Sequence, residues 1–459
     1  MKHTDIIQTL NLEQKCALLS GETVFTTRAL PGKGIPAITL SDGPNGVRKQ
    51  AGAADHLGLN PSVPATCFPT SSATACSWDE KLGEAVGEAL GEEAAAQEVA
   101  VLLGPGLNIQ RSPLCGRDFE YFSEDPILAG RMAAAYVRGI QKNGISACPK
   151  HFAVNSQELR RMASDSVLDE RTLRELYLTG FEIVVKEAKP KTIMTSYNLI
   201  NGTYANENAH LLQDILRKDW GFDGAVVTDW GGSNDHALGV KNGSTLEMPC
   251  PGGDSIRELM KAVQGGKISE ADVDARLDEL LELVLSTHAA VEKAPRTFDA
   301  AAHHKLARRA AAESIVLLRN EGGILPLKPN EKLAVIGDFA ETPRYQGAGS
   351  SAVNALQVDT LLDCIKADDS GITLVGYASG FERQGAAGAE KLEEAVALAK
   401  KADTVLLCLG LDELRESEGL DRADMKLAEN QQRLLAAVAA VNPNVVVLLS
   451  AGAPVETPW

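Results

Sequence analysis

GAVVTDWGG, residues 224–232, places an acidic and an aromatic side chain directly after an apolar run. Residues 225–227 are apolar and follow a glycine, a pattern that predicts a buried strand. Asp229 and Trp230 then stand where the strand ends, and a carboxylate is costly to bury there. Such groups form the active site when they lie at the carboxyl end of a barrel strand. An aspartate at this point can equally cap the next helix, so the stretch alone leaves both interpretations open.

The same plan recurs through the first 290 residues, where strand-like and helix-like segments alternate about seven times. This alternation predicts a parallel sheet with helices outside, and its regular repeat favours an α/β fold with a TIM-type (β/α)8-like barrel. Polar residues follow the predicted strands, and we expect them to converge on one site. These residues are Asp42, Lys150, His151, Tyr197, Asp229 and Glu247. Helices are expected at about 4–20, 79–98, 127–143, 169–188 and 208–219.

The second part of the chain repeats the α/β pattern with longer apolar runs. Buried strands are expected at 333–337, 372–377, 403–410 and 444–450, with helices at 302–318, 388–401 and 426–441. We therefore predict a barrel domain over residues 1–290, a linker and lead-in helix over 291–330, and an α/β-sandwich domain over 331–459 with a mainly parallel sheet. The sequence stops directly after a buried strand, so the last domain is expected to be incomplete at its C-terminus.

Composition narrows the partners. The chain has 459 residues, 44% of them hydrophobic and 23% charged, with a net charge of −17. So strong an acidic balance disfavours nucleic acid and anionic membranes as partners and suits a neutral substrate. No apolar run is long enough for a transmembrane helix, and the N-terminus lacks the apolar core of a signal peptide. The oligomeric state stays open, a homo-oligomer included.

Cysteine and histidine usage indicates a chain without metal or cofactor. The eight cysteines are scattered and form no CxxC pair, which predicts buried free thiols in a reducing compartment and a cytoplasmic location. The eight histidines show no metal-ligand spacing. His303 and His304 are adjacent, and neighbours in a helix point to different faces, so we expect this pair at the surface.

Two loops are rich in charged residues. Residues 104–126 form a long loop with several arginines and carboxylates, which is unusual for a plain linker. DELRESEGLDR, residues 412–422, follows a predicted strand and is too acidic to be buried. Read alone, this second loop is typical of a solvated surface segment.

Motifs in both halves of the chain resemble one family, glycoside hydrolase family 3, in its β-glucosidase-like branch. The resemblance covers nearly the whole chain, and the motifs are specific together although each is weak alone. SDGPNGVR (41–48), GRDFEYFSEDP (116–126), KHFAVNSQELRRM (150–162), TSYNLING (195–202) and VVTDWGG (226–232) resemble its barrel domain. LRNEGGILPL (318–327) and ESEGLDR (416–422) resemble its second, α/β-sandwich domain.

The resemblance implies a retaining β-glycosidase that hydrolyses terminal non-reducing β-D-glucosyl residues by double displacement. Its substrate would be an oligosaccharide or an aryl or alkyl β-glycoside. Asp229 matches the nucleophile, and the acid/base would be Glu418, with Glu416 as second choice. The residues expected to bind substrate are Asp42, Arg117, Lys150, His151, Arg161, Tyr197 and Trp230.

Several alternatives stay open. A β-xylosidase or another β-glycosidase of the family fits the same motifs, as does a catalytically inactive fragment. A Schiff-base aldolase would use Lys150 at a strand end but gives no reason for TDW or ESEGLDR. KHFAVN departs from the KHFPGHG-like loop of the family's β-N-acetylglucosaminidases, which favours the glucosidase-type branch. Taken alone, Tyr197 is equally typical of a core residue, and Arg117 of a structural ion pair.

Overall fold

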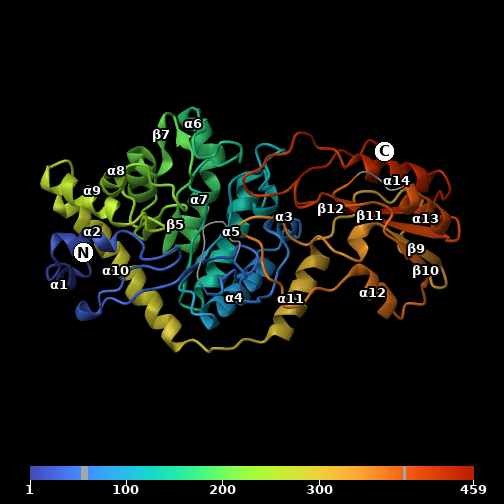
Figure 1. Cartoon of the computed structure of the whole chain (residues 1–459), viewed down its shortest axis with the longest axis horizontal. Coiled ribbons are helices and arrows are strands. Elements are labelled where there is room, and N and C mark those ends of the chain that lie inside the picture. Colours follow the sequence, from blue (N-terminus) through green and yellow to red (C-terminus); the bar gives the residue numbers. More distant parts are fainter. Residues whose placement is uncertain (53–59, 386–388) are drawn as a thin grey trace.

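The computed structural model describes residues 1–52, 60–385 and 389–459, and two hydrophobic cores lie side by side along its long axis (Figure 1). The first core draws its residues from Ile7 through Ala310, with Val353 added from the later chain. The second core runs from Leu333 to Val438. The core therefore changes between residues 310 and 333, whereas the domain boundaries at 290 and 330 stay a prediction.

The first core fills a TIM-like ring of short parallel strands, which confirms the predicted fold class. Parallel ladders join β1 (Leu40–Asp42), β2 (Val101–Leu103) and β3 (Ser146–Ala147), and likewise β5 (Thr192–Met194) and β8 (Ala225–Val227). Isolated parallel bridges continue the ring at Phe152 and Thr195, Val227 and Leu246, and Ser20 and Glu247. An antiparallel bridge between Thr26 and Thr39 closes it. Strands of two or three residues suffice because both their faces are buried.

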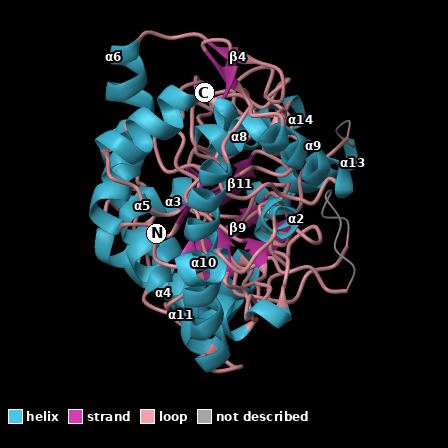
Figure 2. Cartoon of the chain, turned by 90° about the vertical axis from the view of Figure 1, so that its left-hand side faces the viewer, coloured by secondary structure: helices cyan, strands magenta, loops and turns pink. Residues whose placement is uncertain are grey.

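Helices pack around the ring, and a view along the long axis shows many of them on this end of the molecule (Figure 2). The helices α4 (Glu80–Ala96) and α5 (Pro126–Gln141) begin at the side-chain caps Asp79 and Asp125. They pack closely because Gly87 lies against Tyr136, where a methyl group would overlap the backbone. The other helices of this part are α1 (Thr4–Ile7), α2 (Leu12–Leu18), α3 (Ser71–Ala75), α6 (Glu170–Thr172), α7 (Thr179–Ile183), α8 (His236–Asn242), α9 (Gly253–Gln264) and α10 (Glu270–Lys293).

Shorter elements complete the first part. A small sheet of β4 (Asp165–Ser166), β6 (Leu199–Ile200) and β7 (Thr203–Tyr204) stands apart from the ring. Helical segments of π type are η3 (Leu173–Tyr177), η4 (Val184–Ala188) and η6 (His210–Asp219). Single 3-10 turns are η1 (Pro31–Lys33), η2 (Asp118–Glu120) and η5 (Ala205–Glu207).

The second core holds a four-stranded parallel sheet in the order β10-β9-β11-β12. Its strands lie close to the predicted ones because each is a long apolar run. They are β9 (Lys332–Ile336), β10 (Thr373–Ala378), β11 (Thr404–Gly410) and β12 (Val445–Ser450). The helices α12 (Leu361–Ala367), α13 (Ala389–Ala399) and α14 (Glu429–Ala439), with the turn η7 (Asp338–Ala340), flank the sheet.

Two helix predictions need correction, and one long helix was not predicted. The helix expected over 4–20 is two helices, because the side chain of Asn11 caps a new one at Leu12. The helix α11 (Ala300–Glu313) ends five residues before the predicted 318. Residues 315–318 belong to no helix or strand and are exposed, with Ile315 at 71% and Leu318 at 80%. A 24-residue helix, α10, reaches into the stretch expected to be the domain junction.

The histidine pair at 303–304 was also predicted wrongly, since His303 is buried. Its Nδ1 lies 2.7 Å from Glu93 Oε1, and its ring stacks on Phe298. The buried carboxylate of Glu93 compensates for taking the imidazole out of water. No helix in the described part of the chain combines the length and the apolar character needed to cross a membrane.

Candidate active site

Asp229 lies two residues beyond β8, at the carboxyl end of its strand, and is buried. Its Oδ1 accepts a hydrogen bond of 2.8 Å from the backbone amide of Trp230. Its Oδ2 has no hydrogen-bond partner among the described residues, and His151 Nε2 lies 3.6 Å away. The side chain caps no helix, so the structure favours the site over the cap for GAVVTDWGG.

The cations around Asp229 counteract the effect of burial on its pKa. Burial raises the pKa of Asp229, while the cations Arg161, Arg117 and Lys150 hold it back, and the pKa stays above its usual value. Burial and the cations Arg117 and Lys150 push the pKa of His151 well below its ordinary value, so this imidazole is neutral. The contact between His151 and Asp229 is therefore not an ion pair.

A buried network of Arg117, Glu120 and Lys150 lies beside Asp229. Arg117 donates from Nε to Glu120 Oε2 at 2.7 Å and from Nη2 to Glu120 Oε1 at 2.9 Å. Lys150 Nζ lies 3.2 Å from Glu120 Oε1. Burial raises the pKa of Glu120, but Arg117 and Lys150 outweigh it and leave the pKa below its usual value. Arg117 thus forms a buried ion pair with Glu120, and its remaining nitrogen, Nη1, has no hydrogen-bond partner among the described residues.

Glu418 belongs to the same network although it comes from the second half of the chain. Its Oε1 lies 2.9 Å from Arg161 Nη1 and 3.6 Å from Arg117 Nη1. The backbone amide of Ser350 donates to Oε2 at 2.7 Å. Burial raises the pKa of Glu418, but Arg117, Arg161 and Ser350 together bring it well below its usual value. Glu418 is therefore a carboxylate in the ligand-free chain.

Glu416, two residues earlier, has different partners. It is fully buried, forms an ion pair with Arg344, and accepts a hydrogen bond of 2.9 Å from the backbone amide of Gly452. The expectation that the acidic loop 412–422 is too charged to be buried was therefore wrong. Glu416 and Asp412 are buried because each meets a donor, an arginine for Glu416 and backbone amides for Asp412.

The remaining predicted binding residues line this network. Burial raises the pKa of Asp42, at the end of β1, to about 6, against the lowering effect of Lys150. The hydroxyl of Tyr197 donates to the carbonyl of Trp230 at 2.8 Å, and the Arg161 guanidinium lies 4.8 Å from the centre of the Tyr197 ring. Trp230 is fixed by a hydrogen bond of 2.6 Å from its Nε1 to the carbonyl of Val24.

One of the predicted converging residues lies elsewhere. The carboxylate of Glu247 accepts hydrogen bonds from Ser20, at 2.9 Å, and from Ser255, and His236 lies 3.8 Å away. Ser20 follows α2, Ser255 lies in α9 and His236 begins α8, so Glu247 connects the ring to its outer segments. The sequence pattern located the segment of Glu247 correctly, but it did not show in which direction the side chain points.

Four polar residues of the site were not predicted as binding residues. Tyr121 OH lies 3.2 Å from His151 Nδ1, and Asn155 donates to that hydroxyl at 3.1 Å. Asn108 holds the backbone of His151 by accepting at 2.8 Å and donating at 2.9 Å. Glu158 accepts from Arg161 Nη1 at 2.7 Å. Tyr121, Asn155 and Glu158 lie inside the quoted motifs, so their position was a usable signal.

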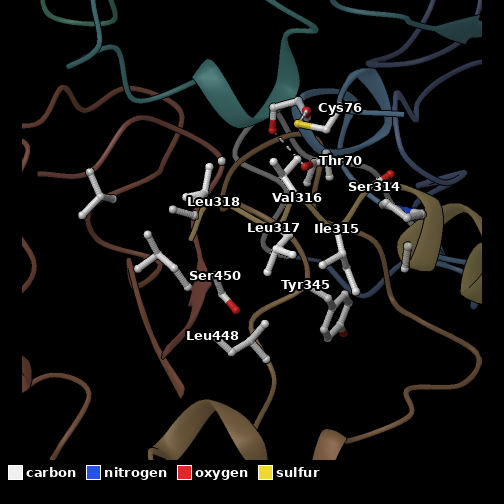
Figure 3. A pocket seen from close by; sticks show the side chains of 18 of the residues that line it. Thr70, Cys76, Ser314, Ile315, Val316, Leu317, Leu318, Tyr345, Leu448 and Ser450 are labelled. Carbon is white, nitrogen blue, oxygen red and sulfur yellow. Dashed lines mark hydrogen bonds between the residues drawn. The ribbon is translucent and has the colours of Figure 1, made fainter. Parts of the chain in front are cut away.

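A large cavity lies apart from this network. It measures about 1330 Å³ and lies against β12 and the extended residues after α11 (Figure 3). Its walls are mainly apolar, and neither Asp229 nor Glu418 lines it. The labelled wall residues are Thr70, Cys76, Ser314, Ile315, Val316, Leu317, Leu318, Tyr345, Leu448 and Ser450. Volume alone is therefore a poor guide to the chemistry of this chain.

Within the described residues, no group of three or more His, Cys, Asp or Glu side chains is arranged to hold a metal ion. All eight cysteines are free, but only four of them are buried; three are half-buried and Cys76 is exposed. The barrel contributes buried carboxylates, arginines and a lysine to the site, and the parallel-sheet domain contributes one carboxylate. The chain is therefore a two-domain α/β protein whose polar site is built from both domains.

Comparison with known proteins identifies the family. The model "Glycosyl hydrolase family 3 N terminal domain" matches residues 40–283, and "Glycosyl hydrolase family 3 C-terminal domain" matches residues 315–459. The chain belongs to glycosyl hydrolase family 3.

Relatives are similar over almost the whole chain. A thermostable β-glucosidase B from Acetivibrio thermocellus is 46% identical over 99% of this chain and 60% of its own length. An exo-α-(1→6)-L-arabinopyranosidase from Bifidobacterium longum is 44% identical over 99% of this chain and 61% of its own. The chain thus spans about three fifths of the length of these curated relatives.

Solved structures show the same fold. A family 3 β-glucosidase from Bifidobacterium adolescentis has a TM-score of 0.92 at 42% identity, covering 98% of this chain and 64% of its own. β-Glucosidase 3B from Thermotoga neapolitana, in complex with α-D-glucose, has a TM-score of 0.88 at 33% identity, covering 100% and 70%.

Proposed function

We propose that the chain is a retaining β-glycosidase that hydrolyses terminal non-reducing β-D-glucosyl residues. The observation that carries the proposal is the pair Asp229 and Glu418, which share the cations Arg117 and Arg161. Within the part of the chain that the structure describes, the buried atoms Asp229 Oδ2 and Arg117 Nη1 have no hydrogen-bond partner, as expected where a polar ligand supplies one. The names of the similar β-glucosidases support a glucoside as substrate.

In the first step Asp229 acts as the nucleophile. Its free Oδ2 attacks the anomeric carbon and forms a glycosyl ester while the bond from that carbon to the leaving oxygen breaks. The hydrogen bond from Trp230 to Oδ1 keeps Oδ2 as the attacking oxygen. Glu418 gives a proton to the leaving oxygen, so that an alcohol departs.

In the second step Glu418 takes a proton from water, and the oxygen of this water attacks the anomeric carbon. The ester bond to Asp229 breaks, and the sugar leaves with its original configuration. The lowered pKa keeps Glu418 ionised, so it can accept a proton, although a pKa nearer the working pH would make it a stronger base. The first step needs a protonated Glu418, so we infer that substrate weakens the contact between Arg161 and Glu418 when it binds.

The remaining residues hold the sugar. Asp42 and Lys150 bind hydroxyls far from the anomeric carbon, and the neutral His151 can accept or donate one hydrogen bond there. Arg117 offers its free Nη1 to a hydroxyl. Trp230 presents an indole that is fixed through Val24, which suits the aglycone side of the bond.

A panel of nitrophenyl glycosides tests the proposal. The β-glucoside should give the largest kcat/KM, and proton NMR should show the β-anomer of glucose first. The panel includes the α-L-arabinopyranoside as second candidate, because one relative of 44% identity carries that activity in its name, and the β-xyloside. No release above the level of Asp229→Asn with any member would support an inactive fragment. An α-anomer appearing first would contradict double displacement.

The organisation of the chain is part of the same proposal. Two separate cores support a division into residues 1–290, 291–330 and 331–459, with nucleophile and acid/base on different domains. Eight free cysteines support a cytoplasmic location. A homo-oligomer stays a prediction that sedimentation can test.

A further inference from the structure

We propose that Asp421 is a positioning residue, which fastens the loop of Glu418 to two loops of the barrel and so fixes the acid/base over Asp229. The inference rests on the proposed glycosidase function. Asp421 touches none of the reacting groups, and it acts through the backbone around Glu418.

Both oxygens of the Asp421 carboxylate accept hydrogen bonds from backbone amides of the barrel. Its Oδ1 accepts from Gly116 and from Glu158, each at 3.0 Å. Its Oδ2 accepts from Glu158 at 3.0 Å and from Leu159 at 2.8 Å. One side chain of the second domain thus joins two barrel loops that are more than 40 residues apart in sequence. Hydrogen bonds to an ionised carboxylate are among the stronger ones in proteins.

A second contact runs in the opposite direction across the same interface. The backbone amide of Gly419, next to Glu418, donates to Glu158 Oε2 at 2.8 Å. Glu158 also binds Arg161, the cation that pairs with Glu418. The barrel residue Glu158 therefore holds both the backbone and the charge partner of the acid/base.

The fit between the loops leaves no spare room. A methyl group on Gly116 would overlap the carbonyl oxygens of Leu420 and Ser417. On the far side, the amide of Glu418 donates to the carbonyl of Ala348 at 3.0 Å. The Glu418 loop lies between the barrel and residues 348–350, and Asp421 makes the hydrogen bonds on the barrel side.

Loss of the hydrogen bonds between Asp421 and the barrel should affect protonation of the leaving group more than attack by Asp229. Replacing Asp421 by Asn turns one acceptor oxygen into an NH2 group that faces backbone N–H donors. The loop moves, Glu418 loses its place, and substrates that need an acid suffer. A substrate with a good leaving group still reacts, since its oxygen departs without a proton.

The experiment compares Asp421→Asn with Asp424→Asn in the full chain. Asp424 is the matched control, because its carboxylate accepts hydrogen bonds from Arg415 and from the Lys426 amide, both within the same loop. Across a series of aryl glucosides, Asp421→Asn should lose on the order of 30-fold or more in kcat/KM with the poorest leaving groups and about threefold or less with dinitrophenyl glucoside. Asp424→Asn should match the parent. Equal losses across the series, or no loss, would overturn the proposal.

A steric variant gives an independent test. Gly116→Ala keeps Asp421 but pushes the loop away, and it should show the same dependence on the leaving group. Gly32→Ala is its control, because nothing lies within 4 Å of the added methyl group. Normal kinetics of Gly116→Ala would contradict the role of the interface.

Hydrogen–deuterium exchange separates this inference from the proposed function. Asp421→Asn should speed exchange of the amides at 116, 158, 159 and 419, and Asp424→Asn should not. If the parent hydrolyses no glycoside, the proposed function fails while this exchange result still decides whether Asp421 fastens the loop. Unchanged exchange in Asp421→Asn would overturn the inference even in an active enzyme.

Discussion

Glu416 and Glu418 stand two residues apart on one loop and lie in opposite kinds of surroundings. Glu416 pairs with Arg344 and accepts a hydrogen bond from the Gly452 amide. Glu418 pairs with Arg117 and Arg161, two of the cations that also lower the pKa of Asp229. A carboxylate that shares its cations with a second buried carboxylate is a candidate for chemistry, whereas Glu416 forms a separate structural ion pair.

The largest expected effect on hydrolysis comes from replacing Asp229, the second carboxylate of the site. Asp229→Asn should lower hydrolysis on the order of 10³-fold or more, because the nucleophile is lost while the site keeps its shape. The melting temperature should stay near that of the parent, since the described residues give the Asp229 side chain one hydrogen bond, from the Trp230 amide. Initial rates and calorimetry measure both quantities. A folded variant with near-normal activity would remove Asp229 from the role of nucleophile.

Glu418→Ala should separate substrates by their leaving groups. We expect a loss of about 10²-fold or more for poor leaving groups and a much smaller loss for activated aryl glucosides. Added azide should restore turnover, because an anion attacks the glycosyl enzyme without a general base. Rescue of Glu416→Ala by azide, with Glu418→Ala unaffected, would exchange the two roles.

Glu416→Ala should act on stability instead. Removing one member of a buried ion pair leaves Arg344 charged and unpaired, which costs about 3–5 kcal/mol in the free energy of unfolding. Urea denaturation followed by circular dichroism measures this change. Glu413→Ala is the control on the same loop, because its partner Arg383 keeps Asp338. A variant as stable as the parent would contradict the structural role of Glu416.

The smallest effect concerns Asp42, whose pKa is raised to about 6 in the folded chain. A carboxyl group with a raised folded pKa binds its proton more tightly when folded, so stability falls as pH rises from about 4 through about 6. Asp42→Asn removes this loss. Relative to the parent, the variant should therefore be about 2 kcal/mol more stable at pH 7 than at pH 4 while binding glucose more weakly. Denaturation at the two pH values checks the sign, and a reversed difference would contradict the raised pKa.

Local patterns predicted much of the fold. The strands β9, β11 and β12 were found within a residue or two because each is a run of apolar, mostly β-branched or leucine residues. The helix α11 was predicted too long because residues 315–318 are as apolar as a buried helix face, although Ile315 and Val316 favour extended backbone. The long helix α10 was missed despite a capping box at Ser269 and Asp272.

The site was predicted less completely because its partners lie far away in sequence. Arg344 and Ser350 stand 72 and 68 residues before Glu416 and Glu418, and no local pattern links them. Spacing also could not choose between the two glutamates, because residues two apart share a face in an extended segment. His303 was misplaced for the same reason, since its partner Glu93 is 210 residues earlier.

The apolar wall along β12 has a colloidal consequence. Exposed leucines and an unpaired sheet edge attract other apolar surfaces, while the net charge of −17 keeps copies of the chain apart. Salt shortens the range of that repulsion to about 3 Å at 1 M and leaves the apolar attraction in place. Light scattering of the chain should therefore rise with ionic strength. A buffer of low salt is the natural choice for keeping it dispersed.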